Sequence, residues 1–420
     1  MTLESIRQDV RVALSSGLAF IEQCGVETFD PLDVSTHPAT QRLLIVRSRS
    51  GSIFRKLFWA GSYFAPRWNR RCLGIQPAAM HSGVANLASA YLEVGGAANL
   101  EKARKWLTWL ESTSFNFSKY RGWGFPFPWK QKLLVLSGTP IGHTTMTCAN
   151  VFLKFASLTG DESHFRMVRS ACDFFHYGLK QSPRKDGAVA LSYTPLDETH
   201  IINIQADIAS LLLRFWSVGG EERDRELGLK LLRCVLQTQN QDGSWSYYAP
   251  DTTATSNYVD NHHTGMILSS LAEIEHANLL PDEISPCVRD ALISGADYFL
   301  ERLFLSDGTP KYYSDSLHPI EIYNFAQSIF TFLDLKAVLR ADETRYRKVE
   351  ERLNQVILRL LELMRKTDGG FLYRRMKWAR QDLNSLRWAN ALTVAALGRW
   401  LRETEDCETK SGERISLQNA

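Results

Sequence analysis

The sequence lacks the short patterns that mark many catalytic and binding sites. It holds no CxxC pair, no HExxH, no P-loop, no GxGxxG and no nucleophile-elbow serine. Zinc ribbons, zincin proteases, nucleotide-binding loops and α/β-hydrolases therefore have no support. Its seven cysteines are odd in number and widely spaced, which excludes a dense disulfide framework and favours reduced thiols in a cytoplasmic protein. We expect no metal ion and no other cofactor.

Long apolar runs and an excess of one charge are missing too. No run of about 18 uncharged apolar residues exists, so a transmembrane helix is not expected. The first twenty residues mix charged with apolar residues and lack a small-residue cleavage site, which is typical of an amphipathic helix and not of a signal peptide. The net charge of +3 gives no argument for nucleic-acid binding.

A unit of about 60 residues recurs along the chain. It combines a charged amphipathic helix, a loop rich in glycine and aromatic residues, and a more apolar helix. The periodicity predicts charged helices at 3–23, 101–113, 163–179, 221–239, 283–302 and 342–366, and apolar helices at 77–94, 140–158, 200–218, 260–278, 319–338 and 383–402.

Four of the intervening loops begin with an Asp-Gly pair, at Asp186-Gly187, Asp242-Gly243, Asp307-Gly308 and Asp368-Gly369. Glycine takes a positive φ without strain, which suits the tight turn that follows a helix end. Alternating aromatic residues follow the turn and predict short β-like segments at one rim of the fold.

Amphipathic helices that alternate with apolar ones pack best as a double ring. We therefore predict an all-α (α/α)6 toroid of about six helical hairpins, with an open helical solenoid as the alternative. Residues 1–404 would form one domain, with an N-terminal helix and a basic, aromatic segment in 1–74 and the repeats in 75–404. Residues 405–420 would form a flexible tail.

The segment LQTQNQDGSW resembles the repeat of the terpenoid-cyclase and prenyltransferase toroid superfamily, whose spacing Gln239, Gly243 and Trp245 match. In that superfamily the motif is structural, so the resemblance implies a six-hairpin fold and not a reaction. The stretches GWGFPFPWK…GTPIGHTT and YVDNHHTGMILSSL resemble a bacterial family of six-hairpin proteins found with polysaccharide biosynthesis. This resemblance, over roughly residues 75–340, implies a carbohydrate context.

Polar residues at the starts of the apolar helices should converge at one rim of the toroid. The strongest local signal is the run from Asp260 to Thr264, where a histidine beside a carboxylate at a helix N-terminus can transfer protons. Adjacent histidines face different ways, so at most one of His262 and His263 should reach the cavity, and we favour His263. Helix capping and packing are the alternative role.

A second candidate acid or base is Glu321, which could flank a glycosidic bond together with Asp260. Tyr193 and Tyr248 complete the predicted catalytic residues, because they occupy similar places in their loops. The predicted substrate-binding residues are loop aromatics, polar residues at helix starts and two arginines: Trp123, Phe127, Trp129, His143, Asn203, Trp245, Asn261, Tyr313, Asn324, Tyr373, Arg375 and Arg387.

Positive charge gathers in two segments. Residues 374–387 hold four arginines and a lysine, which favours an anionic ligand such as a uronate, a sugar nucleotide or a diphosphate, with a solvated surface as the alternative. Residues 55–71 mix five basic with five aromatic residues. That segment could contact a membrane surface or a lipid-linked substrate, or could pack over one end of the barrel.

Terpene cyclases need Asp-rich motifs and protein prenyltransferases an Asp-x-Cys zinc pair, and both are missing. The leading hypothesis is a carbohydrate-active enzyme, namely a hydrolase, lyase or epimerase, that acts on an acidic sugar or oligosaccharide or on a lipid-linked sugar. An isoprenoid-handling enzyme and a non-catalytic assembly component of a polysaccharide pathway are the alternatives. The oligomeric state is left open.

Overall fold

The computed structural model describes residues 2–34, 37, 38, 40, 42, 53, 58, 60–130, 134–252 and 257–418. In this part of the chain, helices of an inner layer alternate with helices of an outer layer. The inner helices are α5 (His81–Val94), α7 (Gly142–Thr159), α9 (Ile202–Ser217), α11 (Asn261–His276), α13 (Ile322–Val338) and α15 (Ala391–Gln418). The outer helices are α1 (Leu3–Cys24), α6 (Ala97–Ser112), α8 (Phe165–Tyr177), α10 (Glu222–Gln237), α12 (Ser285–Arg302) and α14 (Glu343–Met364).

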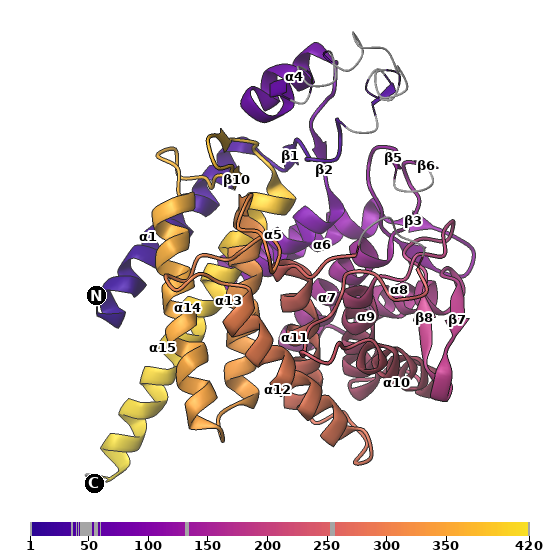
Figure 1. Cartoon of the computed structure of the whole chain (residues 1–420), viewed down its shortest axis with the longest axis vertical. Coiled ribbons are helices and arrows are strands. Elements are labelled where there is room, and N and C mark those ends of the chain that lie inside the picture. The colour runs from indigo at the N-terminus through magenta and orange to yellow at the C-terminus, as the bar shows by residue number, and fades with distance from the viewer. Residues whose placement is uncertain are drawn as a thin grey trace.

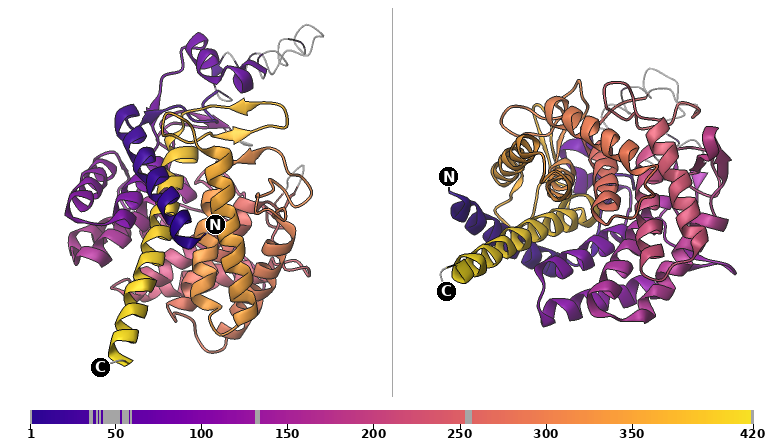
Figure 2. Two further views of the ribbon diagram at one scale, coloured as in Figure 1. Left: turned by 90° about the vertical axis from the view of Figure 1, so that its left-hand side faces the viewer. Right: turned by 90° about the horizontal axis from the view of Figure 1, so that it is seen from below.

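The inner helices form a closed ring. Each packs against the next in chain order, and α15 returns to contact α5, so the ring has no free end. Each outer helix covers its inner partner, and the first helix, α1, covers the last, α15. Figure 2 shows the ring from below, and Figure 1 shows it from the side. The predicted (α/α)6 toroid is confirmed, and the open solenoid is excluded.

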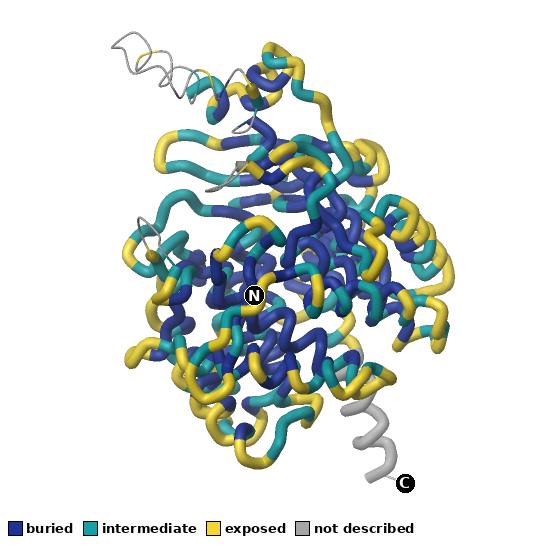
Figure 3. Tube along the Cα trace, turned by 90° about the vertical axis from the view of Figure 1, so that its right-hand side faces the viewer, coloured by how far each residue is buried: buried dark blue, intermediate teal, exposed yellow. Residues whose placement is uncertain are grey.

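The burial of each layer follows from its sequence pattern. Thirteen of the sixteen residues of α9 are buried, because outer and inner neighbours cover this apolar helix. The outer helix α10 buries one stripe, which includes Leu227, Leu231 and Val235, and keeps charges on its other face. Figure 3 shows the same contrast over the molecule.

The last inner helix begins later than predicted. A short π-helix, η3 (Leu386–Asn390), precedes α15, and the hydroxyl of Ser385 accepts a bond from the backbone N–H of Trp388 at 3.4 Å. The other inner helices begin one to four residues after their predicted starts. Because α15 continues to Gln418, helix also spans the predicted tail from residue 405 onward, and the domain boundaries stay a prediction.

Short strands and turns join the helices, as the loops predict. The strands are β1 (Glu27–Thr28), β2 (Ala78–Ala79), β3 (Phe115–Asn116), β4 (Arg121–Gly122), β5 (Trp129–Lys130), β6 (Leu134–Val135), β7 (Gln181–Pro183), β8 (Val189–Leu191), β9 (Ile320–Glu321), β10 (Arg374–Arg375) and β11 (Arg380–Gln381). They pair antiparallel as β1–β2, β3–β4, β5–β6, β7–β8 and β9–β10–β11. Short helices α4 (Pro66–Cys72), η1 (Glu162–His164) and η2 (Lys185–Gly187) complete the described elements.

Glycines in the loops let one hairpin approach the next. Gly243 has a φ of 87°, and a Cβ atom there would lie 2.4 Å from the carbonyl oxygen of Ser294 in α12. Gly369 has a φ of 89°, and a Cβ atom would lie 2.8 Å from the carbonyl oxygen of Ser16 in α1. Only glycine combines this conformation with so close a contact. The second contact helps to hold α1 against the loop that follows α14.

The motif formed by Gln239, Gly243 and Trp245 connects α10 to α12 through hydrogen bonds. Gln239 donates from its side-chain amide to the carbonyl oxygen of Ala291 at 2.9 Å, and the indole of Trp245 donates to that of Val235 at 3.0 Å. Trp245 is only 2% exposed. Its role is structural, as the toroid resemblance implies, and it is not the substrate contact predicted above.

The basic, aromatic segment 55–71 lies partly outside the described residues, which omit 55–57 and 59. Arg70 is buried and forms an ion pair with Asp33 at 2.8 Å, so this charge serves packing. Phe64 and Trp68 are exposed, and α4 stands above the ring in Figure 1. A membrane contact here stays a prediction. None of the described helices has the length and apolar composition that crossing a bilayer requires.

Replacing Trp245 with alanine should lower the free energy of unfolding by about 3–5 kcal/mol, because it leaves a large cavity between α10 and α12. Urea denaturation followed by circular dichroism measures the change. Trp378→Ala is the matched control, since that indole is 87% exposed and its loss should change stability by about 0.5 kcal/mol or less. Equal effects of the two substitutions would contradict the structural role of the motif.

Candidate functional site

The ring encloses a cavity of about 1650 Å³ that runs along its axis. Near the N-terminal ends of the inner helices it is lined by His143, His262, Arg387 and Trp388. Lys154 lies eleven residues after His143 on α7, or about 16 Å further along the axis at 1.5 Å per residue. The cavity exceeds the roughly 300–1,000 Å³ of a typical small-molecule site, so it has room for a ligand larger than one sugar ring.

His143 and His262 lie at the end of the cavity that is near the N-terminal ends of the inner helices, and we call this end the upper cavity. Burial lowers the pKa of His143, and with the smaller effects of the nearby charges of Arg387 and His263 it brings this pKa to about 3. Burial likewise holds the pKa of His262 well below its usual range, with contributions from His263 and His143. Each imidazole is therefore neutral at pH 7, chiefly because of its burial.

The ring of His262 is held by aromatic contacts from two other elements. Its centroid lies 4.8 Å from that of Tyr323, edge to face, and 6.1 Å from that of Trp388. Its Nδ1 atom has no hydrogen-bond partner among the described residues. A neutral imidazole fixed in the cavity wall is suited to acid–base chemistry.

Arg387 reaches the cavity from η3 and is fixed by the N-terminal segment. Its Nε lies 3.0 Å from Oδ2 of Asp30, and both side chains are nearly fully buried. Its guanidinium lies 4.8 Å from the ring centroid of Phe125 and 4.3 Å from that of Trp388. This stacking, the ion pair with Asp30 and a hydrogen bond from Nη2 to Oδ1 of Asp30 at 3.3 Å hold the arginine in one orientation beside the histidines.

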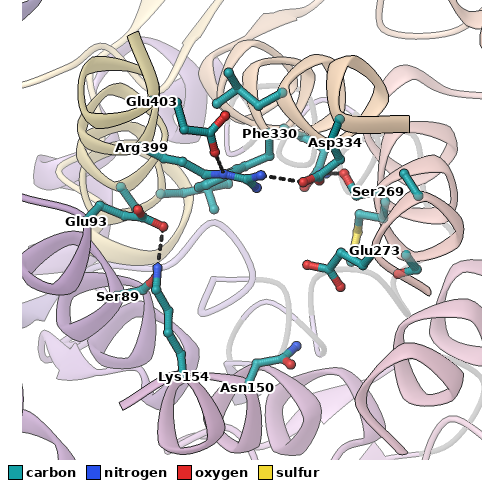
Figure 4. Close-up of a pocket in the computed structure, with 18 of the residues that line it drawn as sticks. Ser89, Glu93, Asn150, Lys154, Ser269, Glu273, Phe330, Asp334, Arg399 and Glu403 are labelled. Atoms are coloured by element: carbon teal, nitrogen blue, oxygen red, sulfur yellow. Dashed lines mark hydrogen bonds and ion pairs between the residues drawn. The ribbon is translucent and has the colours of Figure 1, made fainter. Parts of the chain in front are cut away.

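A belt of charges lines the other end of the cavity. We define the charged belt as Glu93, Lys154, Arg214, Glu273, Asp334, Arg399, Arg402 and Glu403. Its members come from all six inner helices, and Figure 4 shows several of them around the open centre.

Each charge of the belt has a partner of opposite sign. Glu93 pairs with Lys154 and, at 2.8 Å, with Arg402. Arg399 joins Asp334 at 2.5 Å and Glu403 at 2.7 Å, while Arg214 and Glu273 lie 3.4 Å apart. Burial raises the pKa of Glu93, but its cations outweigh this and hold that pKa below the usual range. The side chains of the belt are therefore paired as ions, and their positive and negative charges offset one another.

The predicted Asp260–His263 pair exists, but neither residue lines the cavity. Asp260 caps α11, where its Oδ1 accepts from the backbone N–H of His263 at 2.8 Å and its Oδ2 lies 2.6 Å from Nδ1 of that ring. The ring of His263 packs 4.5 Å from that of Tyr247. The neighbouring His262 is the histidine that reaches the cavity, and not His263 as predicted.

Glu321 is fully buried and pairs with Arg374. Burial raises the pKa of its carboxyl to about 7, against the lowering effect of Arg374. It does not line the cavity. The predicted pair of Asp260 and Glu321 therefore does not flank a ligand in the cavity, and that assignment is not retained.

Of the predicted substrate-binding residues, His143 and Arg387 line the cavity. Others are committed to the scaffold: Trp123 donates to the carbonyl oxygen of Leu110, Asn261 to that of Leu303, Asn324 to that of Lys311 and Arg375 to that of Leu363. Asn203 is buried and donates to the sulfur of Met266, and Tyr373 is buried. These residues therefore serve capping and packing, which is the alternative to ligand binding.

The remaining loop aromatics contact one another away from the cavity lining. The ring of Trp129 lies 5.7 Å from that of Tyr193, Tyr248 lies 4.6 Å from Tyr247, and Tyr313 lies 4.8 Å from Tyr258. Phe127 lines a separate apolar pocket of about 590 Å³. A direct role of Tyr193 and Tyr248 in catalysis stays a prediction.

The sequence-based prediction does not include several residues that line the cavity, namely His262, Trp388, Asp207 and the charged belt. The sequence feature that could identify them is a stripe of polar residues along helices that are otherwise apolar. In α11, for example, His262, Met266, Ser269 and Glu273 follow one another at helical spacing on the cavity face. Within the described ranges, no group of three His, Cys, Asp or Glu side chains is placed to hold a metal ion.

Comparison with solved structures supports the fold. The chain is similar to a cellobiose 2-epimerase from Bacillus thermoamylovorans (TM-score 0.59, 10% identity, 77% of this chain and 86% of that chain). It is also similar to a polysaccharide lyase (0.55, 12%, 77% and 90%) and to an α-mannanase from Bacteroides thetaiotaomicron (0.57, 10%, 78% and 88%). No protein-family model matches the sequence, and comparison with curated proteins finds no match. The chain thus has the six-hairpin (α/α)6 toroid fold that these enzymes share.

Replacing Asp30 with alanine should lower the free energy of unfolding by about 3–5 kcal/mol, because it leaves Arg387 buried without a counter-charge. The double variant Asp30→Ala with Arg387→Met should recover part of that loss, since the uncompensated charge is then gone. Urea denaturation of the four proteins of this cycle measures the coupling. Additive losses in the double variant would show that the two residues do not depend on each other.

Proposed function

We propose that this protein is a sugar-modifying enzyme that transfers a proton with His143 and His262. One neutral imidazole removes a proton from a carbon beside a carbonyl group of the sugar. The other donates its N–H to the oxygen on which negative charge develops, as a neutral imidazole can. Arg387 adds positive charge near that oxygen. The intermediate then turns in the cavity, so that its opposite face meets the same imidazole, which is now protonated and returns the proton there. This inverts the carbon, which is an epimerisation.

The observation that carries the proposal is the pair of neutral histidines in the wall of one cavity, coupled to each other and to Arg387. Glycoside hydrolysis is less well supported, because the predicted carboxylate pair does not reach this end of the cavity. One structural neighbour is a cellobiose 2-epimerase, an enzyme of the proposed class.

Elimination from a uronic acid is the second candidate reaction. It begins with the same removal of a proton beside a carboxyl or carbonyl group, and one structural neighbour is a polysaccharide lyase. The two reactions differ in the fate of the intermediate, which loses a leaving group in one and regains the proton in the other. The products distinguish them.

The cavity favours a hydroxyl-rich ligand over an isoprenoid. Its walls carry the charged belt and polar residues such as Asn86 and Gln327, which can bond sugar hydroxyls but are poor neighbours for a hydrocarbon chain. Its volume also argues against a purely structural, plugged toroid. Asp30 offsets the charge of Arg387, so a neutral sugar fits this end as well as the acidic or lipid-linked sugar predicted from the sequence.

Incubation with sugars in D₂O should replace a carbon-bound proton with deuterium, which ¹H NMR follows as the loss of one signal. The panel comprises reducing mono- and disaccharides and uronic-acid oligosaccharides. His143→Asn and His262→Asn should each lower the exchange rate by about 10²–10⁴-fold, because the proton acceptor or the oxyanion donor is lost.

His276→Asn is the matched control, since His276 also lines the cavity but lies at the C-terminal end of α11. It should exchange at the wild-type rate. Absence of exchange with every sugar, or wild-type rates in both site variants, would rule out the proposed reaction.

The rate of exchange should stay constant as the pH falls from 7 to about 5. The reactive form of the base is the unprotonated imidazole, and a pKa of about 3 for His143 keeps it unprotonated over this range. An ordinary histidine would lose half of its base form near pH 6.5. A pH profile of kcat/KM measures this, and an acid limb with a midpoint near 6.5 would contradict a neutral, buried base.

A further inference from the structure

The residues that line the cavity differ in exposure between its two ends. In the upper cavity Ser82, His262 and Arg387 are buried, and within the described ranges no exposed side chain lines this end. At the opposite end Leu158 is 62% exposed and Val218 is 46% exposed, and both also line the cavity. A side chain is both exposed and part of the lining where a cavity meets the surface, so the cavity opens at this second end.

The exposed part of the lining defines a mouth at the C-terminal ends of the inner helices. The mouth comprises Leu158, Ser217, Val218, His276, Ala277 and Arg340, which lie on α7, α9, α11 and α13 or just after them. Leu158 follows His143 on α7 by fifteen residues, so the mouth lies about 22 Å from the histidines at 1.5 Å per residue. The charged belt lies between the two, because Lys154 and Glu273 precede the mouth residues of their helices.

Aromatic side chains cover the cavity at the end next to the histidines. We define this roof as Phe125, Trp129, Tyr193, Tyr323 and Trp388, none of which is exposed. The ring of Trp129 lies 5.5 Å from that of Phe125 and 5.7 Å from that of Tyr193, and the rings of Tyr323 and Trp388 lie 4.8 Å apart. The guanidinium of Arg387 stacks on both Phe125 and Trp388 and so joins the two groups. The loops that the sequence places at the working rim therefore close the cavity there.

We propose that a ligand enters the cavity through the mouth, passes the charged belt and reaches the histidines end first. The roof stops it there, so only a terminal residue of a sugar chain meets His143 and His262, while the residues behind it lie in the belt and the mouth. The substrate class that fits this shape is a linear oligosaccharide modified at one end. This inference rests on the proposed function for the reaction, but the route can be tested without a reaction.

The walls of the passage suit a sugar chain. The ion pairs of the belt offset one another, so a neutral ligand passes without a net charge to oppose it. Lys154 carries hydrogen-bond donors and Glu273 carries acceptors, and Asn150, one turn further inward, offers both. Figure 4 shows these side chains around the open centre. Hydroxyl groups of a chain in the passage can therefore find partners between the mouth and the histidines.

Labelling of a thiol inside the cavity tests the route without a reaction. Ser89 lines the cavity one helical turn inward of Glu93, so Ser89→Cys places a thiol of similar shape behind the belt. The probe is a methanethiosulfonate that carries a glucosyl group, which resembles the expected ligand in size. Adding Leu158→Trp and Val218→Trp narrows the mouth and should slow labelling by about fivefold or more, because access to the buried thiol is restricted. Mass spectrometry of the peptide that contains position 89 measures the rate separately from the native cysteines.

Leu196→Trp in the Ser89→Cys background is the matched control. Leu196 is 47% exposed, close to the value for Val218, but it lies on the loop before α9, whereas Val218 follows the end of that helix. This control should label at the rate of Ser89→Cys alone. Equal rates with the open and the narrowed mouth, slowing by Leu196→Trp instead, or no labelling of Ser89→Cys at all would overturn the proposed route.

The end-first orientation is tested with an oligosaccharide that shows deuterium exchange. Deuterium should enter one terminal residue of the chain and no internal residue, which ¹H NMR resolves, and the narrowed mouth should lower kcat/KM while Leu196→Trp leaves it unchanged. Exchange in internal residues would overturn the end-first orientation. Absence of exchange with every sugar would overturn the proposed function, while the thiol labelling would still decide the route.

Discussion

Ionisable groups that face the central cavity must be either paired or uncharged, because burial removes the water that would otherwise stabilise a charge. The toroid satisfies this condition differently at its two ends. Around the C-terminal ends of the inner helices, Glu93, Asp334 and their partners form the charged belt. Toward the N-terminal ends, His143 and His262 remain neutral, and Arg387 is the cation that Asp30 compensates. Proton transfer requires groups that can change charge, and these are found at the upper end.

The closed ring makes this arrangement possible. Each inner helix turns a polar stripe toward the axis and is covered elsewhere by its neighbours, so residues far apart in sequence meet in one cavity. Closure depends on both ends of the chain, because α1 covers α15 and Asp30 holds Arg387. The N-terminal segment is thus part of the site as well as of the scaffold. An epimerase, a lyase and a mannanase share this fold, so the side chains in the cavity, and not the ring, determine the reaction.

The fold was predictable and most of the site was not. A repeat of hydrophobicity fixes the layer to which each helix belongs, and Gln239, Gly243 and Trp245 kept the structural role that their pattern implies. Which side of an inner helix faces the axis depends on its rotation, and that is set by packing between distant segments. For this reason the sequence favours His263, whereas the structure places its neighbour His262 at the cavity. The sequence likewise predicts Glu321 at the cavity, whereas this carboxylate pairs with Arg374 in the scaffold.

The central claim is that two imidazoles of the upper cavity stay neutral in mildly acid solution. The most direct test is ¹⁵N NMR of protein labelled at its ten histidines, titrated from pH 7.5 to 5, with His143→Asn and His262→Asn used to assign the two signals. The ¹⁵N shifts of His143 and His262 should remain those of neutral imidazole at pH 5. Imidazolium shifts for both residues at pH 5.5 would contradict the account.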